Sequence, residues 1–252
     1  MQPSNLLPAG NPLGFPRCAR CPYVRTGPAY ICLGCARQTF ENIAANSCPI
    51  CSQMLDGDGS CPNWLCTDPA RRVGVIHAIA YLSGPLRDVL LSYKYGQGRG
   101  WAVIFGRLVL GWLFEHAASD PPGLIVANPT YTGPDQRAFA HTEAVLEMAA
   151  REDVLGLWPI DVASPRAIVK ARGTAKSAHA TAKAKREAAR ELRSALWIPD
   201  PARTAGRYVL VYDDVCTTAS QLDAVADCLL REGRASRVDA LVLARAPWRR
   251  RT

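Results

Sequence analysis

The stretch over residues 207–222, RYVLVYDDVCTTASQL, constrains the fold of this chain more than any other. It opens with an apolar run over residues 208–212, which predicts a strand buried on both faces, as in a parallel sheet. Asp213 and Asp214 follow at the carboxyl end of that strand. After a turn of small and hydroxylated residues, apolar positions recur with helical spacing, and Gly233 favours the end of a helix.

This order of elements indicates a binding site for a phosphorylated sugar. Free N–H groups at a helix N-terminus, with hydroxyl groups beside them, form an anion site. Two carboxylates would repel a bare phosphate, but they accept hydrogen bonds from sugar hydroxyls, and a divalent cation offsets their charge. Two simpler interpretations stay open. Asp214 or Thr217 caps the helix, or the acid pair holds magnesium in an unrelated phosphotransfer fold.

The stretch resembles the phosphoribosyl diphosphate (PRPP) loop of type I phosphoribosyltransferases, in which two acids precede V-x-T-T-G-x-T. The resemblance implies that Asp213 and Asp214 hold the ribose 2′ and 3′ hydroxyls and act in catalysis. It also implies a turn around the 5′-phosphate, made by Val215, Cys216, Thr217, Thr218, Ala219 and Ser220. Ala219 replaces the usual Gly, and Ser220 replaces the last Thr. Alanine fits only with a negative φ, because a Cβ makes positive φ costly.

Length and composition predict one medium domain and a smaller module within the 252 residues. Residues 1–17 hold four prolines and no periodic pattern, so we expect a flexible leader. Residues 18–70 carry eight of the ten cysteines, and residues 71–252 carry the α/β pattern. We find no signal peptide, and the most apolar stretch, residues 101–114, is shorter than the ~20 residues of a membrane span. These features favour a cytoplasmic protein.

Four closely spaced cysteine pairs dominate residues 18–70. In a reducing compartment such pairs indicate metal ligands, because two thiolates in one tight turn reach the same tetrahedral ion. The short segments between the pairs cannot build a core unaided, so zinc would supply folding energy. We therefore expect two structural zinc ions, held by Cys18, Cys21, Cys32, Cys35, Cys48, Cys51, Cys61 and Cys66.

Two arrangements of these pairs stay open. Sequential pairing gives one ion to the first two pairs and the other ion to the last two, whereas cross-braced pairing alternates them. Sequential pairing closes shorter loops, and we favour it. A redox-active CxxC is the competing interpretation, but no thioredoxin-like pattern adjoins the pairs.

From residue 71 onwards we expect strands that alternate with helices, and therefore a mainly parallel sheet. The expected strands cover residues 73–82, 124–128, 157–162, 167–170, 208–212 and 238–243. Expected helices begin at Pro85, cover residues 101–116 and 136–151, include the basic segment, and follow the turn after Asp214. Ligands of such sheets bind at the carboxyl ends of the strands, where the acid pair lies.

Over nearly its full length the chain resembles the ComF-like family, described as predicted amidophosphoribosyltransferases, in which a double zinc ribbon precedes a type I phosphoribosyltransferase domain. Lys94 lies in a Tyr-Lys-Tyr-Gly stretch that resembles the family's K-Y-G segment, which implies a phosphate contact. Asn128 and Pro129 end a stretch in the place of its diphosphate loop. Arg137 matches the R-G-F-N-Q motif and would hold diphosphate as a fork of donors.

The same motif also departs from the family pattern. Ala138, Ala140 and His141 replace its Gly, Asn and Gln, which bears on turnover more than on PRPP binding. Simpler roles stay open for three residues. Lys94 would be a solvated helix end, Arg137 a surface cation, and His141 a packed or surface histidine rather than a base.

The resemblance implies an enzyme that binds PRPP with magnesium, transfers phosphoribose to a nitrogen acceptor and releases diphosphate. Fixed charges around the developing oxocarbenium ribose would supply electrostatic catalysis. The alternative is a non-enzymatic factor for the uptake or processing of single-stranded DNA, with a degenerate PRPP site. It would bind nucleic acid through residues 166–193, which hold nine basic and two acidic residues. That segment is otherwise a solvated amphipathic helix or a lid over diphosphate.

Overall fold

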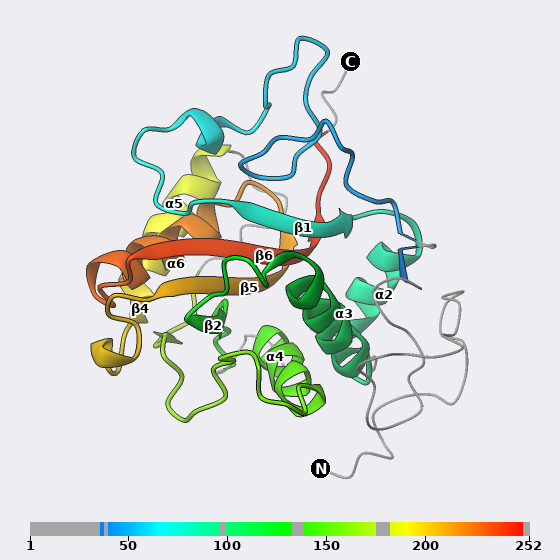
Figure 1. The fold of residues 1–252 in the computed structure, drawn as a ribbon. Helices are drawn as coiled ribbons and strands as arrows, with labels where there is room; N and C mark the ends of the chain where they lie inside the picture. The colour runs from blue at the N-terminus through cyan, green and yellow to red at the C-terminus, as the bar shows by residue number, and fades with distance from the viewer. Residues whose placement is uncertain (1–35, 38–39, 96–98, 133–138, 175–181, 249–252) are drawn as a thin grey trace.

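The computed structural model describes residues 36–37, 40–95, 99–132, 139–174 and 182–248. Its main sheet has four parallel strands in the order β1-β6-β5-β2 (Figure 1). Their bounds are β1 Ile76–Tyr81, β2 Leu124–Ala127, β5 Tyr208–Cys216 and β6 Arg237–Arg245. The α/β class and the parallel sheet are therefore confirmed.

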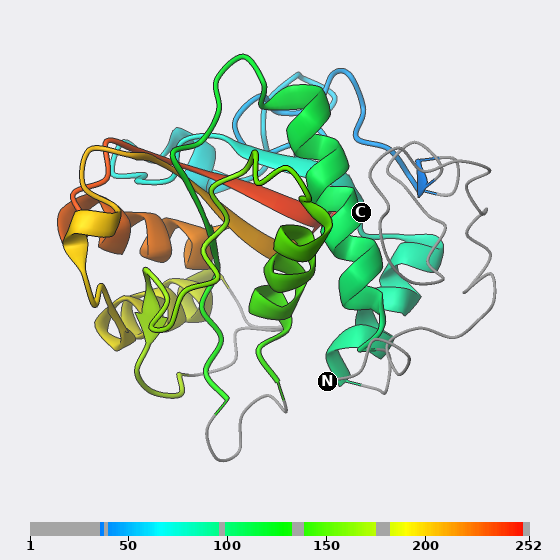
Figure 2. The same ribbon diagram turned by 60° about the horizontal axis from the view of Figure 1, so that its bottom comes forward.

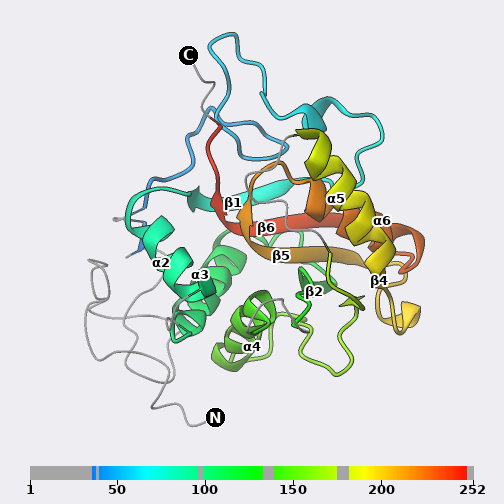
Figure 3. The ribbon, with the colours of Figure 1, turned by 180° about the vertical axis from the view of Figure 1, so that it is seen from behind.

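Helices cover both faces of this sheet. One face carries α2 Gly84–Tyr95, α3 Trp101–His116 and α4 His141–Glu152 (Figure 2). The other face, seen from behind, carries α5 Ala182–Ala195 and α6 Ser220–Arg231 (Figure 3). The described part of the chain also contains two short 3-10 helices, η3 Trp64–Thr67 and η4 Pro201–Arg203.

The alternation of side chains along β5 divides the interior into two cores. Leu210 and Tyr212 pack with the buried residues of α2, α3 and α4, whereas Val209 and Val211 pack with those of α6. All four side chains are almost completely buried. Both faces of the strand are covered, as its unbroken apolar run predicts.

The structure extends β5 beyond the predicted end at Tyr212. The strand continues through both acids to Cys216, because β6 still pairs with it there: Asp213 lies opposite Val242, and Cys216 lies opposite Arg245. The predicted helix over residues 136–151 begins only at His141, and Ala140 before it has non-helical dihedral angles.

The predicted strand over residues 157–162 is wrong. Only Ile160 forms a bridge in this stretch, to Ile125 of β2. The carboxylate of Asp161 accepts hydrogen bonds from the N–H groups of Ala163 and Ala167, which bends the chain into a loop. The next predicted strand is reduced to β3 Val169–Lys170, which pairs antiparallel with β4 Leu196–Trp197 outside the main sheet.

The described part of the cysteine-rich segment packs against the sheet. The N–H of Ile76 in β1 donates to the carbonyl of Ile50 at 2.7 Å, and Ser52 Oγ donates to the carbonyl of Ile76 at 2.8 Å. Cys51 and Leu65 are buried in the same core as Val211 of β5. Within the described ranges, no helix has the length and apolar character needed to cross a membrane.

Helices α3 and α4 cross at Gly106, where their backbones come so close that there is no room for a side chain. A Cβ at Gly106 would lie 2.7 Å from the backbone nitrogen of Ala149 and 3.1 Å from the carbonyl oxygen of Val145. Next to this crossing, the buried guanidinium of Arg107 pairs with Glu152, with Nε 3.2 Å from Oε2. The crossing sets the position of α4, whose first residue is His141.

We expect Gly106→Ala to lower the free energy of unfolding by roughly 1–3 kcal/mol, because the new methyl group meets backbone atoms that cannot rotate away. Gly57→Ala is the matched control, since nothing lies within 4 Å of its added Cβ. Urea unfolding followed by circular dichroism measures both variants. Equal stabilities for the two would show that the crossing is looser than the structure indicates.

Candidate functional site

The acid pair lies at the carboxyl end of β5, and strand alternation points its two side chains to opposite faces. Both carboxylates are buried, with 6% of Asp213 and 3% of Asp214 exposed. Asp213 Oδ2 accepts a hydrogen bond from Asn128 Nδ2 at 2.9 Å, and its Oδ1 accepts one from the N–H of Asp214 at 2.9 Å. Asn128 directly follows β2, so neighbouring parallel strands bring both side chains to one edge.

Asp214 faces the other layer, where two nitrogen atoms share one of its oxygens. Lys94 Nζ lies 2.8 Å from Asp214 Oδ2, and His141 Nε2 lies 3.0 Å from the same atom. Lys94 comes from the last turn of α2, and His141 is the first residue of α4. In this structure Lys94 therefore contacts a carboxylate, whereas the sequence predicts a phosphate contact for it.

His141 is the member of this cluster that sequence reasoning left out of the predicted site. Its ring is buried, its carbonyl accepts a hydrogen bond from Tyr93 Oη at 2.5 Å, and its Nδ1 lies 3.4 Å from Thr130 Oγ1. The available signal was its place at the start of the helix that follows β2. Ligand atoms of His141, Asp213 and Asp214 lie within 4.8 Å of one another and could hold a metal ion.

The two acids have opposite shifts in pKa. Burial, together with the negative charge of Asp214, raises the pKa of Asp213 to about 7. Burial also opposes ionisation of Asp214, but the charge of Lys94 and the contact with His141 outweigh it and lower the pKa of Asp214. The site therefore favours the ionised form of Asp214 and disfavours that of Asp213.

The first turn of α4 holds the segment after β2 in place. Glu143 Oε1 accepts a hydrogen bond from the N–H of Thr130 at 2.7 Å, and Thr142 Oγ1 donates one to the carbonyl of Asn128 at 2.7 Å. Pro129 lies between these two anchored residues. The anchors fix the backbone of Asn128, and through it the amide that contacts Asp213.

The turn after β5 lines a pocket together with the first acid. The lining residues are Asp213, Val215, Cys216, Thr217, Thr218, Ala219, Ser220, Gln221 and Leu222. Helix α6 begins at Ser220, and no side chain caps it at Ala219, so its first turn offers N–H groups to an anion. Thr218 Oγ1 and Ser220 Oγ lie 3.0 Å apart and add hydroxyl donors.

The backbone of Ala219 contradicts the expected negative φ. Its φ is +66° and its ψ is 0°, so alanine adopts the left-handed conformation that glycine usually fills. A Cβ in this conformation costs roughly 1–2 kcal/mol. The carbonyl of Ala219 accepts the N–H of Asp223 at 2.9 Å, and its side chain is buried, so its surroundings hold it in this strained state.

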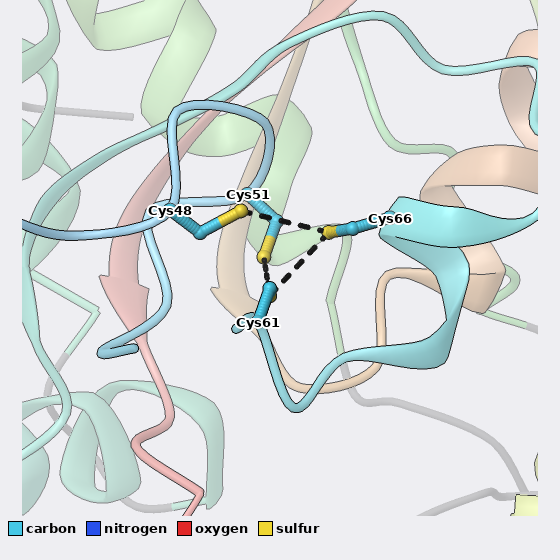
Figure 4. Close-up of side chains that lie close together, drawn as sticks. All are labelled: Cys48, Cys51, Cys61 and Cys66. Carbon is cyan, nitrogen blue, oxygen red and sulfur yellow. Dashed lines mark hydrogen bonds between the residues drawn. The ribbon is translucent and has the colours of Figure 1, made fainter. Parts of the chain in front are cut away.

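A second candidate site is formed by Cys48, Cys51, Cys61 and Cys66, whose sulfur atoms point toward one another (Figure 4). Their Sγ atoms are separated by 3.8 Å between Cys48 and Cys66, 3.7 Å between Cys51 and Cys61, and 3.7 Å between Cys61 and Cys66. A tetrahedral zinc ion with Zn–S bonds of about 2.3 Å requires sulfur atoms about 3.8 Å apart. The four cysteines therefore fit one zinc ion, in the grouping that sequential pairing predicts.

Electrostatics also suit a metal at this site. Interaction with Cys66 lowers the pKa of the Cys51 thiol to about 4 against the effect of burial, and the charge of Arg245 contributes. Burial and the neighbouring cysteines raise the pKa of Cys61 and Cys66, so among these thiols the thiolate form, which binds metal, is favoured at Cys51. The other predicted ligands, Cys18, Cys21, Cys32 and Cys35, lie outside the described residues, as do Arg137 and Ala138.

Comparison of the chain with protein-family models and with curated proteins gave no match.

We expect Cys66→Ser to lose one zinc ion per chain, because three thiolates leave the tetrahedral site one ligand short. Cys228→Ser is the control, since Cys228 is a buried cysteine of α6 outside the cluster. Mass spectrometry of the metal in protein purified without chelator gives the ratio. Equal zinc in the two variants would argue against this site.

The pKa of Asp213, about 7 in the folded chain, predicts a pH-dependent stability. The pKa of an aspartate in the unfolded chain is about 3.9. Between that pH and the pKa of the folded state, the folded state keeps a proton that the unfolded state releases. The free energy of unfolding contributed by Asp213 therefore falls as the pH rises from about 4 to about 7. Asp213→Asn removes this proton, and its stability should fall less steeply across the same window. Urea unfolding at several pH values compares the wild type with this variant. Parallel curves of unfolding free energy against pH would contradict the raised pKa.

Proposed function

We propose that this protein binds PRPP with magnesium in the pocket beside Asp213 and acts as a phosphoribosyltransferase. One observation carries the proposal: Asp213 and the uncapped first turn of α6 line the same pocket. Sugar hydroxyls require an acceptor, and a 5′-phosphate requires N–H and O–H donors. The pocket offers both within one short stretch of chain.

The two acids take different parts in this proposal. Asp213 lines the pocket, and a carboxylate has about four lone-pair sites, so it can accept a ribose hydroxyl while it keeps Asn128. Asp214 points to the other face and is held ionised by Lys94 and His141. Its fixed negative charge lies beside the place where positive charge would develop on the ribose during transfer.

Magnesium fits the oxygen donors of this edge. The carboxylates are hard oxygen ligands of the kind that Mg²⁺ binds. The positive charge of Lys94 offsets part of their negative charge, which reduces their repulsion of a metal-bound diphosphate. Bound with PRPP, magnesium would neutralise the diphosphate that leaves. The chain's own residues hold the ribose, fix Asn128 and present the phosphate turn.

The finer parts of the proposal come from the resemblance to the ComF-like family. They are a fold of the type I phosphoribosyltransferase kind, a nitrogen acceptor, a second zinc ion at the first four cysteines, and a diphosphate contact by Arg137. The geometry of the last four cysteines supports one of the two sites of the double zinc ribbon. The pocket at the end of β5 supports the transferase domain.

The alternative function, binding of single-stranded DNA through the basic segment, has weaker support. Several arginines of this segment already have acidic partners among the described residues. Arg193 contacts Asp227 at 2.7 Å and Glu232 at 2.9 Å, and Arg166 pairs with Glu147. Such pairs leave less free positive charge for a phosphate backbone. We therefore treat DNA binding as a competing outcome of the test below.

We expect the double change Asp213→Asn and Asp214→Asn to weaken magnesium-dependent PRPP binding by roughly a hundredfold or more. Each charge-assisted hydrogen bond contributes ~1.5–3 kcal/mol, and tenfold in affinity corresponds to ~1.4 kcal/mol. Isothermal titration calorimetry with PRPP and magnesium measures the loss. A pair of acids that only caps the helix would behave differently, because Asn caps about as well as Asp.

Asp200→Asn is the matched control, because Asp200 caps the distant helix η4 and does not line the pocket. The control should bind PRPP as tightly as the wild type. Wild-type affinity in the folded double variant would remove the proposed site. Binding of single-stranded DNA that persists at moderate salt, with no response to PRPP, would instead favour the alternative function.

A further inference from the structure

One buried arginine connects the four-cysteine site with the turn that lines the pocket. Arg245 is the last residue of β6, and its side chain is fully buried. Its Nη2 donates to Cys51 Sγ at 3.6 Å. Its Nη1 donates to the carbonyl of Cys216 at 2.9 Å and also to the carbonyl of Thr217. A single guanidinium thus contacts a metal ligand and the first two residues of the turn.

The sheet register explains why this side chain reaches both sites. Arg245 lies opposite Cys216, where β5 ends and the turn begins. The next residue, Ala246, donates its N–H to the carbonyl of Cys216 at 2.9 Å, and its own carbonyl accepts Gln53 Nε2 at 3.4 Å. Gln53 is completely buried and follows Cys51 by two residues. A second, weaker chain of contacts therefore runs parallel to the first.

The charge of Arg245 requires an anionic partner. The structure gives it no ion pair with a carboxylate within the described residues, and its Nε has no hydrogen-bond partner there. A buried cation without a counter-charge is strongly destabilising. Four thiolates around one divalent ion carry a net charge of about −2, which supplies the missing counter-charge through Cys51.

The contacts of Arg245 also set the direction of the peptide groups in the turn. The C=O and N–H of a trans peptide point in opposite directions. With the carbonyls of Cys216 and Thr217 fixed on the guanidinium, the N–H groups of Thr217 and Thr218 point away from it. Ala219 follows directly and is held with φ +66°, so this turn depends on its neighbours to keep its shape.

We propose that Arg245 is a positioning residue through which the four-cysteine metal site controls the phosphate-binding turn. With the metal in place, the thiolate cluster fixes the guanidinium, and the guanidinium fixes the turn in the shape that binds the phosphate. Loss of the metal releases the four sulfur atoms from one another and frees the turn. The identity of the ligand, a phosphorylated ribose, rests on the proposed function, whereas the coupling itself does not.

The test is a double-mutant cycle between the two sites, read by hydrogen exchange of residues 216–222 without ligand. Arg245→Met keeps an apolar stem of similar length but removes the charge and the donors. Cys66→Ser removes one ligand of the metal site. Cys66 was chosen because none of the hydrogen bonds of Arg245 goes to it, so the change acts on Arg245 only through the metal site. We expect each single variant to speed hydrogen exchange of the turn by about tenfold or more. The double variant should exchange no faster than the single variants, because both changes break the same link between the metal site and the turn.

Zinc content and ligand binding separate this inference from a structural effect. Arg245→Met should keep most of its zinc and lose about tenfold or more in PRPP affinity, because hydrogen bonds to the turn are lost. Arg245→Lys, which keeps the charge but not the fork, should also keep its zinc and should recover little of the affinity. Arg237→Met, on the same strand but half exposed, is the control and should change neither.

If Arg245→Met fails to fold, removal of zinc from the wild-type protein with a chelator replaces it. Faster exchange confined mainly to residues 216–222 would support the coupling. Unchanged exchange of the turn after zinc removal, or effects of Cys66→Ser and Arg245→Met that simply add, would overturn it. Coupled exchange in a protein that does not bind PRPP would uphold the coupling and reject the proposed function alone.

Discussion

The parallel pairing of β5 with β6 is the constraint on which both candidate sites depend. It continues past the predicted strand end to Cys216 and Arg245, so the acid pair belongs to the sheet rather than to a loop. Strand alternation then separates the two acids, with Asp213 toward the pocket and Asp214 toward α2 and α4. A slip of one residue in this register would exchange the two environments.

This separation explains how one edge of the sheet can hold two buried carboxylates. The charge of Asp214 is balanced within the protein by Lys94, and His141 contacts the same oxygen, with the two side chains coming from two helices of the same layer. Asp213 accepts hydrogen bonds from the amide of Asn128 and from a backbone N–H, and it carries the raised pKa. The acid next to the pocket is therefore the one whose charge a ligand can change, since hydroxyl donors or a cation would favour its ionised form.

Local patterns in the sequence predicted the four strands of the main sheet, most helices, the acid pair and the turn, because burial periodicity and helix signals act over a few residues. They also predicted the grouping of Cys48, Cys51, Cys61 and Cys66. The contacts of His141 and Arg245 could not be predicted, since both depend on sheet register and helix crossing. Arg245 stands near a run of C-terminal arginines, and nothing local in the sequence marks it as buried.

The strained turn and the cysteine site belong to one packed core, which changes what the cysteines stabilise. Cys51, Cys216, Ala219 and Leu222 are all buried in the cluster that covers the α6 side of the sheet. The turn has no side-chain cap and carries a left-handed alanine, so its own local interactions favour another conformation. Packing and the bonds from Arg245 must therefore supply the difference. A metal bound by Cys51 would, under the proposed coupling, stabilise not only its own knuckle but also the backbone that faces the pocket.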